Sequence, residues 1–263
     1  MLASIAVLSA AFALTPGAGP IRQSDAIVWM LNSPSCQSPE RYEAAVARVA
    51  ADAAAGMPLQ RYMLAVLAGS EDLPPVARLD EATRTEYLET TRDRIRSFAE
   101  TRNNPLAWYL LSMENNDIDF LKRAVDGGNV QALNAYGTYL IDKALASGMS
   151  DTNAVASLMA ESFSCFSRAA ERGDANGLYN LGLCRMRGIG CPRDAKLAVA
   201  SLRAAAKAGH PDAMDDLAMC YERGEGVERS ESTSMVWTMR ARALRGDRAA
   251  ARWLESSAYP KDD

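Results

Sequence analysis

The chain has 263 residues, and its 29 basic and 33 acidic side chains give a net charge of −4 and an isoelectric point near 5.3. This balance argues against the broad positive surface that nucleic acid or anionic lipid would require, so we expect no nucleic-acid partner. Hydrophobic residues make up 48% of the chain and aromatic residues only 7%, and the many alanines favour helices over strands. The composition predicts an all-α protein with a packed core.

The first predicted element is the apolar run of residues 1–14, MLASIAVLSAAFAL. It is about as long as the hydrophobic segment of a secretory signal and too short to span a bilayer. We therefore expect a signal peptide over residues 1–20, a periplasmic or secreted protein, and no stable membrane span in the mature chain. Against export, the run lacks Lys and Arg and has no clear cleavage site. The alternatives are a buried first helix, or a true start further upstream, in a cytoplasmic protein.

A helical region with degenerate repeats is expected over residues 21–103, with helical patterns at residues 41–67 and 83–102. Prolines interrupt this part of the chain at expected helix boundaries, namely at Pro58, Pro74, Pro75 and Pro105. Residues 104–128 then form a shortened repeat-like helix pair, which ends in FLKRAVDGG.

A repeat is clearest over residues 129–255, and residues 256–263 form a C-terminal tail. Each unit predicts a helix, a charged turn with two glycines, and a second helix. A glycine closes each second helix, because glycine readily adopts the left-handed conformation that ends a helix. These anchor glycines are Gly128, Gly173, Gly209 and Gly246, with Gly56 and Asn103 as earlier candidates. The repeat length, measured between successive anchors, is 36 positions from Gly173 to Gly209 and 37 from Gly209 to Gly246. Tetratricopeptide repeats are slightly shorter, at roughly 34 residues.

Positions counted from the anchors show a packing pattern. The residue four positions after an anchor is small in every case except the first anchor, Gly56: Ala107, Ala132, Gly177, Ala213 and Ala250. Eight positions on are large apolar residues: Leu64, Leu111, Tyr136, Leu181, Leu217 and Leu254. Nine positions on, small residues recur up to the divergent Glu255: Ala65, Ser112, Gly137, Gly182 and Ala218. Small residues let neighbouring helices approach while the large ones fill the core, so the pattern predicts an α/α solenoid of stacked antiparallel helix pairs.

Two glycine pairs, Gly188 with Gly190 and Gly224 with Gly226, follow the first helices of two repeats. Such a loop invites a nucleotide-binding interpretation. However, no predicted strand precedes either pair and no Lys-Ser/Thr follows it. We therefore interpret both pairs as turns and expect no cofactor.

The repeats resemble the Sel1-like family, whose pattern is A-x-x-x-L-G-x-x-Y-x-x-G-x-G-V followed by an Asp and a second helix ending A-A-x-x-G. The matching residues are Leu181, Gly182, Asp194, Ala205, Ala206, Gly209, Leu217, Tyr221, Gly224, Gly226 and Val227. The departures are Gly177, Arg185, Cys191 and Ala218, none of which disturbs helix pairing. The resemblance implies a superhelix whose concave side is lined by the first helices and holds a protein or peptide partner.

A stripe on the first helices, at positions three, six, seven and ten after the anchors, is expected to face that groove. It comprises Leu59, Tyr62, Met63, Val66, Leu106, Tyr109, Leu110, Met113, Gln131, Asn134, Thr138, Asn176, Tyr179, Asn180, Asp212, Asp215 and Asp216. The candidate ligand-binding residues within it are Tyr62, Tyr109, Asn134, Asn176, Tyr179, Asn180, Asp212, Asp215 and Asp216. The amides would bond a peptide backbone and the aspartates would attract basic side chains. Alternatively, the apolar end belongs to the core and the aspartates form a solvated face.

Catalytic and metal sites are not expected. The only histidine, His210, follows a helix-ending glycine and precedes a proline, a setting for a cap or turn. No Cys or His pair has zinc spacing. The five cysteines, Cys36, Cys165, Cys184, Cys191 and Cys220, cannot all pair within one chain. Cys184 and Cys220 share a repeat position on the packing face and are interpreted as apolar fillers, while Cys184–Cys191 and Cys165–Cys184 are the pairs to consider in an oxidised chain.

The leading hypothesis is an exported scaffold, not an enzyme, that binds a protein or peptide in its concave groove. A second hypothesis is hydrolysis of a glycan or peptidoglycan fragment by a carboxylate pair within Asp212, Asp215 and Asp216. The third is a structural role through end-to-end association of the repeats.

Overall fold

The computed structural model describes residues 39–68, 75–146 and 152–256, and these ranges contain helices and no strand. The expected signal peptide, Cys36, Pro74 and the tail from residue 257 lie outside the described residues. The all-α prediction is confirmed for the described part of the chain. These residues divide into two compact units, here called unit 1 (residues 40–129) and unit 2 (residues 130–256), and each unit is described by itself.

Unit 1 contains the shorter and less regular helices. They are α3 (Pro39–Ala54), α4 (Pro58–Leu67), the 3₁₀ turn η2 (Pro75–Ala77), α5 (Glu81–Arg102), α6 (Pro105–Asn115) and α7 (Ile118–Asp126). Pro58 and Pro105 stand in the first turns of α4 and α6, where a proline loses no helical hydrogen bond. Asn103 ends α5 in the left-handed conformation, as expected for an anchor position. Helix α4 packs on α5, and α6 pairs with α7.

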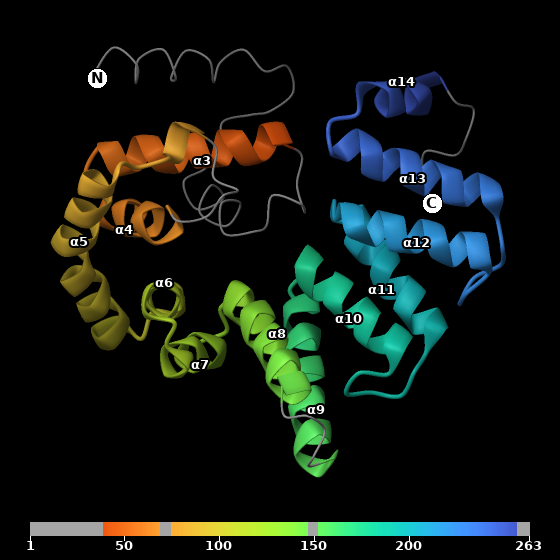
Figure 1. Ribbon diagram of the computed structural model, residues 1–263, viewed down its shortest axis with the longest axis horizontal. Helices are drawn as coiled ribbons and strands as arrows, with labels where there is room; N and C mark the ends of the chain where they lie inside the picture. The colour runs from red at the N-terminus through yellow and green to blue at the C-terminus, as the bar shows by residue number, and fades with distance from the viewer. Residues whose placement is uncertain (1–38, 69–74, 147–151, 257–263) are drawn as a thin grey trace. The chain divides into compact units, whose positions relative to one another are not determined.

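Unit 2 is the regular repeat region. Its helices are α8 (Val130–Ala146), α9 (Thr152–Ala170), α10 (Ala175–Arg187), α11 (Ala195–Lys207), α12 (Pro211–Arg223), α13 (Glu231–Leu244) and α14 (Arg248–Ser256). Three pairs form, α8 with α9, α10 with α11 and α12 with α13, and each pair stacks on the next through α9–α10 and α11–α12 contacts (Figure 1). The predicted arrangement of stacked helix pairs is confirmed.

The small positions of the repeat are points of close helix approach. Ala107, Ala132 and Ala213 are buried, as are Gly177 and Gly182. A Cβ atom on Gly177 would stand 2.5 Å from the Cβ of Ala169 on the preceding helix, α9. On Gly182, it would stand 2.9 Å from the Cδ2 of Leu202. The glycines are therefore required because the neighbouring helix occupies the space of a side chain.

The packing pattern departs from expectation at its two ends. At the N-terminal end, Gln60 occupies a small position and is nevertheless buried. At the C-terminal end, Leu254 is half-buried and Glu255 is exposed. Helix α14 packs on α13, but no described second helix follows it to complete a pair. The end of the pattern thus coincides with the end of the described stack.

The two glycine pairs form turns, as predicted. Gly188 and Gly224 end α10 and α12 in the left-handed conformation. The second glycine of each pair lies against the second helix of the preceding repeat. A Cβ atom on Gly190 would stand 2.1 Å from the carbonyl oxygen of Met159, and one on Gly226 would stand 2.3 Å from that of Ala195. These turns therefore connect successive repeats by direct backbone packing.

Within the described ranges, every helix is too short or too polar to cross a membrane.

Candidate functional site

The first-helix face of unit 2, meaning the side of α8, α10 and α12 that does not pack on the second helices, is the candidate site. Side chains that cap the helix starts fix its geometry. Asp174 Oδ1 accepts a hydrogen bond from the Gly177 backbone N–H at 2.7 Å and begins α10. His210 Nδ1 accepts one from the Ala213 N–H at 3.2 Å and begins α12. Each cap satisfies a backbone donor that would otherwise lack a partner at the helix end.

The residue six positions after an anchor glycine lies on a first helix. Its side chain contacts the turn that precedes the next first helix, here called the junction. Asn134 on α8 donates through Nδ2 to Asp174 Oδ1 at 2.7 Å. The ring of Tyr179 on α10 stacks on His210, with 4.3 Å between ring centroids. These contacts span about one repeat of sequence and stiffen the stack. Asn134 and Tyr179, both expected to bind a ligand, therefore make contacts within the repeat array itself.

His210 is a buried cap, in agreement with the role expected from its sequence position. Only 3% of its surface is exposed. Burial lowers the pKa of its imidazole to about 4, since a charged ring would lose its hydration, and Arg245 acts in the same direction while Asp212 opposes it. The neutral ring keeps Nδ1 as an acceptor for the helix cap. Protonation would remove that lone pair.

The aspartates at the end of the stripe are partly neutralised. Arg245, in the turn before α14, donates to Asp212 Oδ1 through Nη2 and to Asp215 Oδ2 through Nη1, each at 2.6 Å. Asp215 stands at position six, so this ion pair repeats the junction contact made by Asn134 and Tyr179. An attraction for basic ligand side chains is weakened accordingly, because one guanidinium already lies between two of the three carboxylates. The hydrolase hypothesis needs a carboxylate pair among the same three aspartates, two of which bind Arg245.

Asp216 differs from its two neighbours because it lies next to Tyr179. Burial raises the pKa of its carboxyl, while the Tyr179 hydroxyl and Arg187 favour the charged form. The pKa of Tyr179 is raised in turn, by burial first and by Asp216 second. The two groups therefore share a half-buried polar contact between α10 and α12.

Two first-helix residues, Asn180 on α10 and Met219 on α12, take no part in these junction contacts. Asn180 is half-buried and its side chain makes no hydrogen bond within the described part of the chain. Met219, one repeat further on, exposes 41% of its surface. Asn176 is half-buried near the start of α10 and already engages in an interaction within the chain. Among the predicted residues, Asn180 thus makes no side-chain hydrogen bond within the described chain, whereas Asn134 donates to Asp174 and leaves only its buried Oδ1 without a partner.

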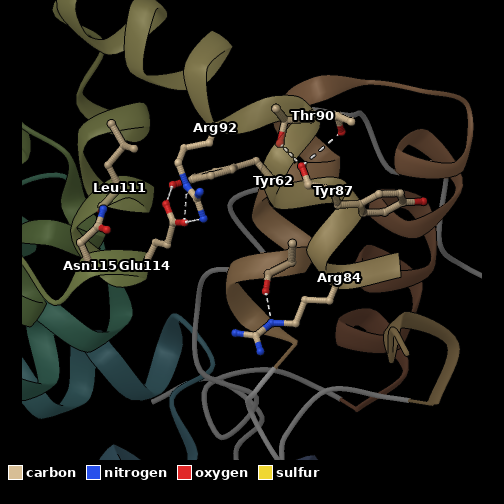
Figure 2. Close-up of polar contacts among 10 residues, drawn as sticks. Tyr62, Arg84, Tyr87, Thr90, Arg92, Leu111, Glu114 and Asn115 are labelled. Carbon is tan, nitrogen blue, oxygen red and sulfur yellow. Dashed lines mark hydrogen bonds and ion pairs between the residues drawn. The ribbon is translucent and has the colours of Figure 1, made fainter. Parts of the chain in front are cut away.

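The apolar end of the stripe, in unit 1, belongs to the core. Tyr62 and Tyr109 were expected in the groove, and the structure corrects this by burying both. The Tyr62 hydroxyl donates to Glu114, which also accepts from Arg92 Nε at 2.7 Å (Figure 2). Burial raises the pKa of Tyr62, and it raises that of Tyr109 to about 12. The short helices of unit 1 need these rings to fill the space between α4, α5 and α6.

The described cysteines carry free thiols. Cys184 and Cys220 are buried in equivalent apolar clusters, as expected for fillers on the packing face. Burial raises the pKa of Cys184 to about 12 and that of Cys220 to about 11, which keeps both thiols protonated and poorly nucleophilic. No group of three or more His, Cys, Asp or Glu side chains is placed to hold a metal ion among the described residues.

Two features escaped sequence reasoning. One is Arg245, which directly precedes the anchor Gly246 and neutralises carboxylates 30 and 33 positions away. The other is a pair of basic side chains on α11, Arg203 and Lys207, which line a pocket. The only sequence signal for the second feature is that these two cations replace uncharged or acidic residues at the equivalent positions of the preceding repeat.

Comparison with known families matches the Sel1 repeat model to residues 159–174, 175–210 and 211–241. The second match spans α10 and α11 and ends at His210, so its boundary falls at the helix cap described above. No curated protein matches the chain.

Among solved structures, the chain is similar to a Sel1 repeat protein from Oxalobacter formigenes, at 21% identity over 48% of this chain and 90% of that one, with a TM-score of 0.41. It is also similar to cysteine-rich protein B from Helicobacter pylori, at 20% identity over 50% and 92% of the two chains, with a TM-score of 0.35. A third is a protective antigen of uropathogenic Escherichia coli with an SLR fold, at 16% identity over 84% and 61%, with a TM-score of 0.40.

Proposed function

The chain carries Sel1 repeats over residues 159–241, and from this premise we propose that it is a scaffold whose first-helix face in unit 2 binds a protein or peptide partner. The observation that carries the proposal is that the Asn180 amide makes no hydrogen bond within the described chain, while Met219, on the first helix of the next repeat, is exposed. An amide offers both a donor and an acceptor to a peptide backbone. A flexible thioether adapts to apolar side chains of different shape.

The junction contacts support the same function. Asn134, Tyr179 and Asp215 hold successive first helices in register, so Asn180 and Met219 are presented by a braced surface. Binding to a braced surface costs less conformational entropy than binding to mobile helices. We therefore assign Asn134 and Tyr179 to positioning and Asn180 to contact with the partner.

The test begins with the tagged full chain, recovered from its native host together with the proteins bound to it. Binding of the recovered partner is then measured for the unchanged chain, for Asn180→Ala and for Met219→Asp. We expect each variant to weaken binding by at least about fivefold, since a lost hydrogen bond or a buried unpaired carboxylate costs at least about 1 kcal/mol.

The matched control is Met235→Asp, because Met235 is also exposed but lies on α13, a second helix. Equal losses with Met219→Asp and Met235→Asp would place the contact elsewhere and contradict the proposal. Recovery of a second copy of the chain as the bound protein would favour the self-association hypothesis instead.

Export is part of the proposal and rests on the apolar residues 1–14 alone. The intact mass of the chain recovered from its native host, with and without thiol alkylation, tests it. A mass that lacks about the first 20 residues supports export. A full-length mass with five alkylated thiols contradicts it and places the partner search in the cytoplasm.

A further inference from the structure

A pocket of about 740 Å³ in unit 2 is lined by residues of α11, α12 and the start of α13, and neither Asn180 nor Met219 lines it. The last turns of α11 contribute Arg203 and Lys207, α12 contributes Tyr221, and Arg229 and Thr233 come from the turn and first residues of α13. Polar groups therefore form most of its wall. The proposed scaffold function makes no use of this pocket.

The pocket carries excess positive charge in an acidic chain. Among the described residues, Arg203 and Lys207 have no carboxylate within ion-pair distance. Arg229 pairs with Glu231 at 2.8 Å, and Glu228 is the one carboxylate in the wall. Lys207 is exposed and Arg203 is half-buried. An anion entering the pocket would thus meet two cations that form no ion pair, with Glu228 as the one opposing charge in the wall.

One of these cations is held in place. Arg203 donates through Nη2 to the Tyr221 hydroxyl at 2.7 Å, a bond that joins α11 to α12. A guanidinium has five N–H donors, and a bond to a neutral hydroxyl leaves its full charge and its other donors for a ligand. A planar donor fixed in this way matches the two oxygens of a carboxylate or a phosphate.

The repeat provides an internal comparison. Arg203 and Lys207 stand six and two positions before the anchor Gly209. The same positions before Gly173 hold Ser167 and Glu171, and those before Gly246 hold Arg240 and Leu244. Arg240 lies over the ring of Trp237 on its own helix. The helix pair therefore forms without two cations at these positions, and among these three repeats only the one before Gly209 combines them.

We propose that the pocket binds an oxyanion, the carboxylate or phosphate group of a ligand, through Arg203 and Lys207. Arg203 makes the directed contact, Tyr221 orients its guanidinium, and Lys207 supplies a mobile second charge. Binding weakens as salt rises, because both cations reach solvent.

The test titrates the full chain with three probes: hexaglutamate, hexaglutamine and inorganic phosphate. Amide chemical shifts of the α12–α13 turn locate binding, and calorimetry gives the affinity. We expect hexaglutamate or phosphate to shift these amides and hexaglutamine to leave them unchanged. The double variant Arg203→Gln with Lys207→Gln is expected to weaken binding by at least about tenfold, since a hydrogen bond to a charged group contributes that much.

The matched control is Arg94→Gln with Lys122→Gln. It removes the same two residue types from exposed positions on α5 and α7 of unit 1. Equal weakening by both double variants, or no binding of either anion, overturns the proposal. Binding of hexaglutamate alone identifies an acidic segment as the source of the oxyanion, and binding of phosphate alone identifies a phosphate group. Because Asn180 and Met219 are unchanged in these variants, failure here leaves the proposed partner face intact.

Discussion

Position six after the anchor glycines shows how one residue position serves the same purpose with different chemistry. Asn134 uses a hydrogen bond to Asp174, Tyr179 uses ring stacking on His210, and Asp215 uses an ion pair with Arg245. Each contact joins a first helix to the junction that precedes the next one. Substitutions at this position are therefore expected to loosen the stack before they change any ligand contact.

The buried His210 predicts a pH-dependent stability. Its pKa in the folded chain is about 4, against 6.5 for an unperturbed histidine, so the unfolded chain takes up the proton more readily. The free energy of unfolding is therefore undiminished above about pH 6.5 and falls as the pH is lowered toward 4. At pH 5 the loss amounts to about 2 kcal/mol.

Urea unfolding at pH 7 and pH 5 measures this loss. In His210→Asn, the asparagine retains a cap acceptor and does not titrate, so the difference between the two pH values should shrink by about 2 kcal/mol. Carboxylates that titrate in the same range contribute alike to both proteins. An unchanged pH difference in the variant would show that His210 is not the group responsible.

The Tyr62 hydroxyl in unit 1 predicts a matched pair of substitutions. Tyr62→Phe removes a hydrogen bond to the Glu114 carboxylate and should lower the free energy of unfolding by about 1.5–3 kcal/mol. Tyr109→Phe removes a hydroxyl that makes no hydrogen bond within the described chain, so its effect should stay within about 0.5 kcal/mol. Chemical denaturation of both variants checks the difference. Equal effects would contradict the role of the Tyr62–Glu114–Arg92 contact.

At the scale of the elements, the turn after each first helix sets the spacing of the repeats. Gly188 ends α10, and Gly190 brings the turn against α9 of the preceding pair. Gly224 and Gly226 do the same between α12 and α11. The first glycine of each pair thus adopts the left-handed conformation that ends the helix. The second has no side chain and so lets the turn pack against the backbone of the preceding repeat.

Alanine substitutions should separate these two roles. Gly188→Ala places a Cβ at φ +74° with its nearest neighbour 3.5 Å away, so it should cost only the left-handed conformation, about 1–2 kcal/mol. Gly190→Ala has a similar φ of +66° but meets a backbone oxygen at 2.1 Å, so we expect a loss of roughly 3 kcal/mol or more. Thermal unfolding of the two variants compares them. A loss in Gly190→Ala no larger than in Gly188→Ala would exclude the backbone contact as the cause.

At the scale of the whole molecule, the described chain divides into two compact units. Unit 2 holds apolar clusters such as that of Phe166 with Leu181 and that of Leu217 with Trp237. Since a repeat array gains stability from contacts between neighbouring repeats, unit 2 already includes the neighbours that its central pair requires.

A fragment of residues 130–263 should therefore fold without unit 1. Its circular dichroism spectrum should be helical, and its thermal unfolding should be cooperative, because the fragment retains all three stacked helix pairs. The full chain, unfolded under the same conditions, provides the comparison. A fragment with a disordered spectrum would show that unit 1 is needed for the folding of unit 2.

The sequence by itself determined the helix pairs, their turns and their packing positions. A small residue four positions after an anchor and a large one eight positions after it are properties of one helix face, and Ala213 and Leu217 are buried as this pattern requires. The same local rules identified His210 as a cap and the glycine pairs as turns. Local periodicity is sufficient here because every repeat solves the same packing problem.

Only the tertiary structure decided which polar side chains are already used. Asn134, Asp212 and Asp215 looked equivalent to Asn180 in sequence, but their partners Asp174 and Arg245 lie 30 or more positions away. Tyr62 and Tyr109 likewise became core residues because their helices, α4 and α6, pack on each other and on α5. A hydrogen bond or an ion pair depends on where two side chains meet across repeats, and the period of a single helix does not contain that information.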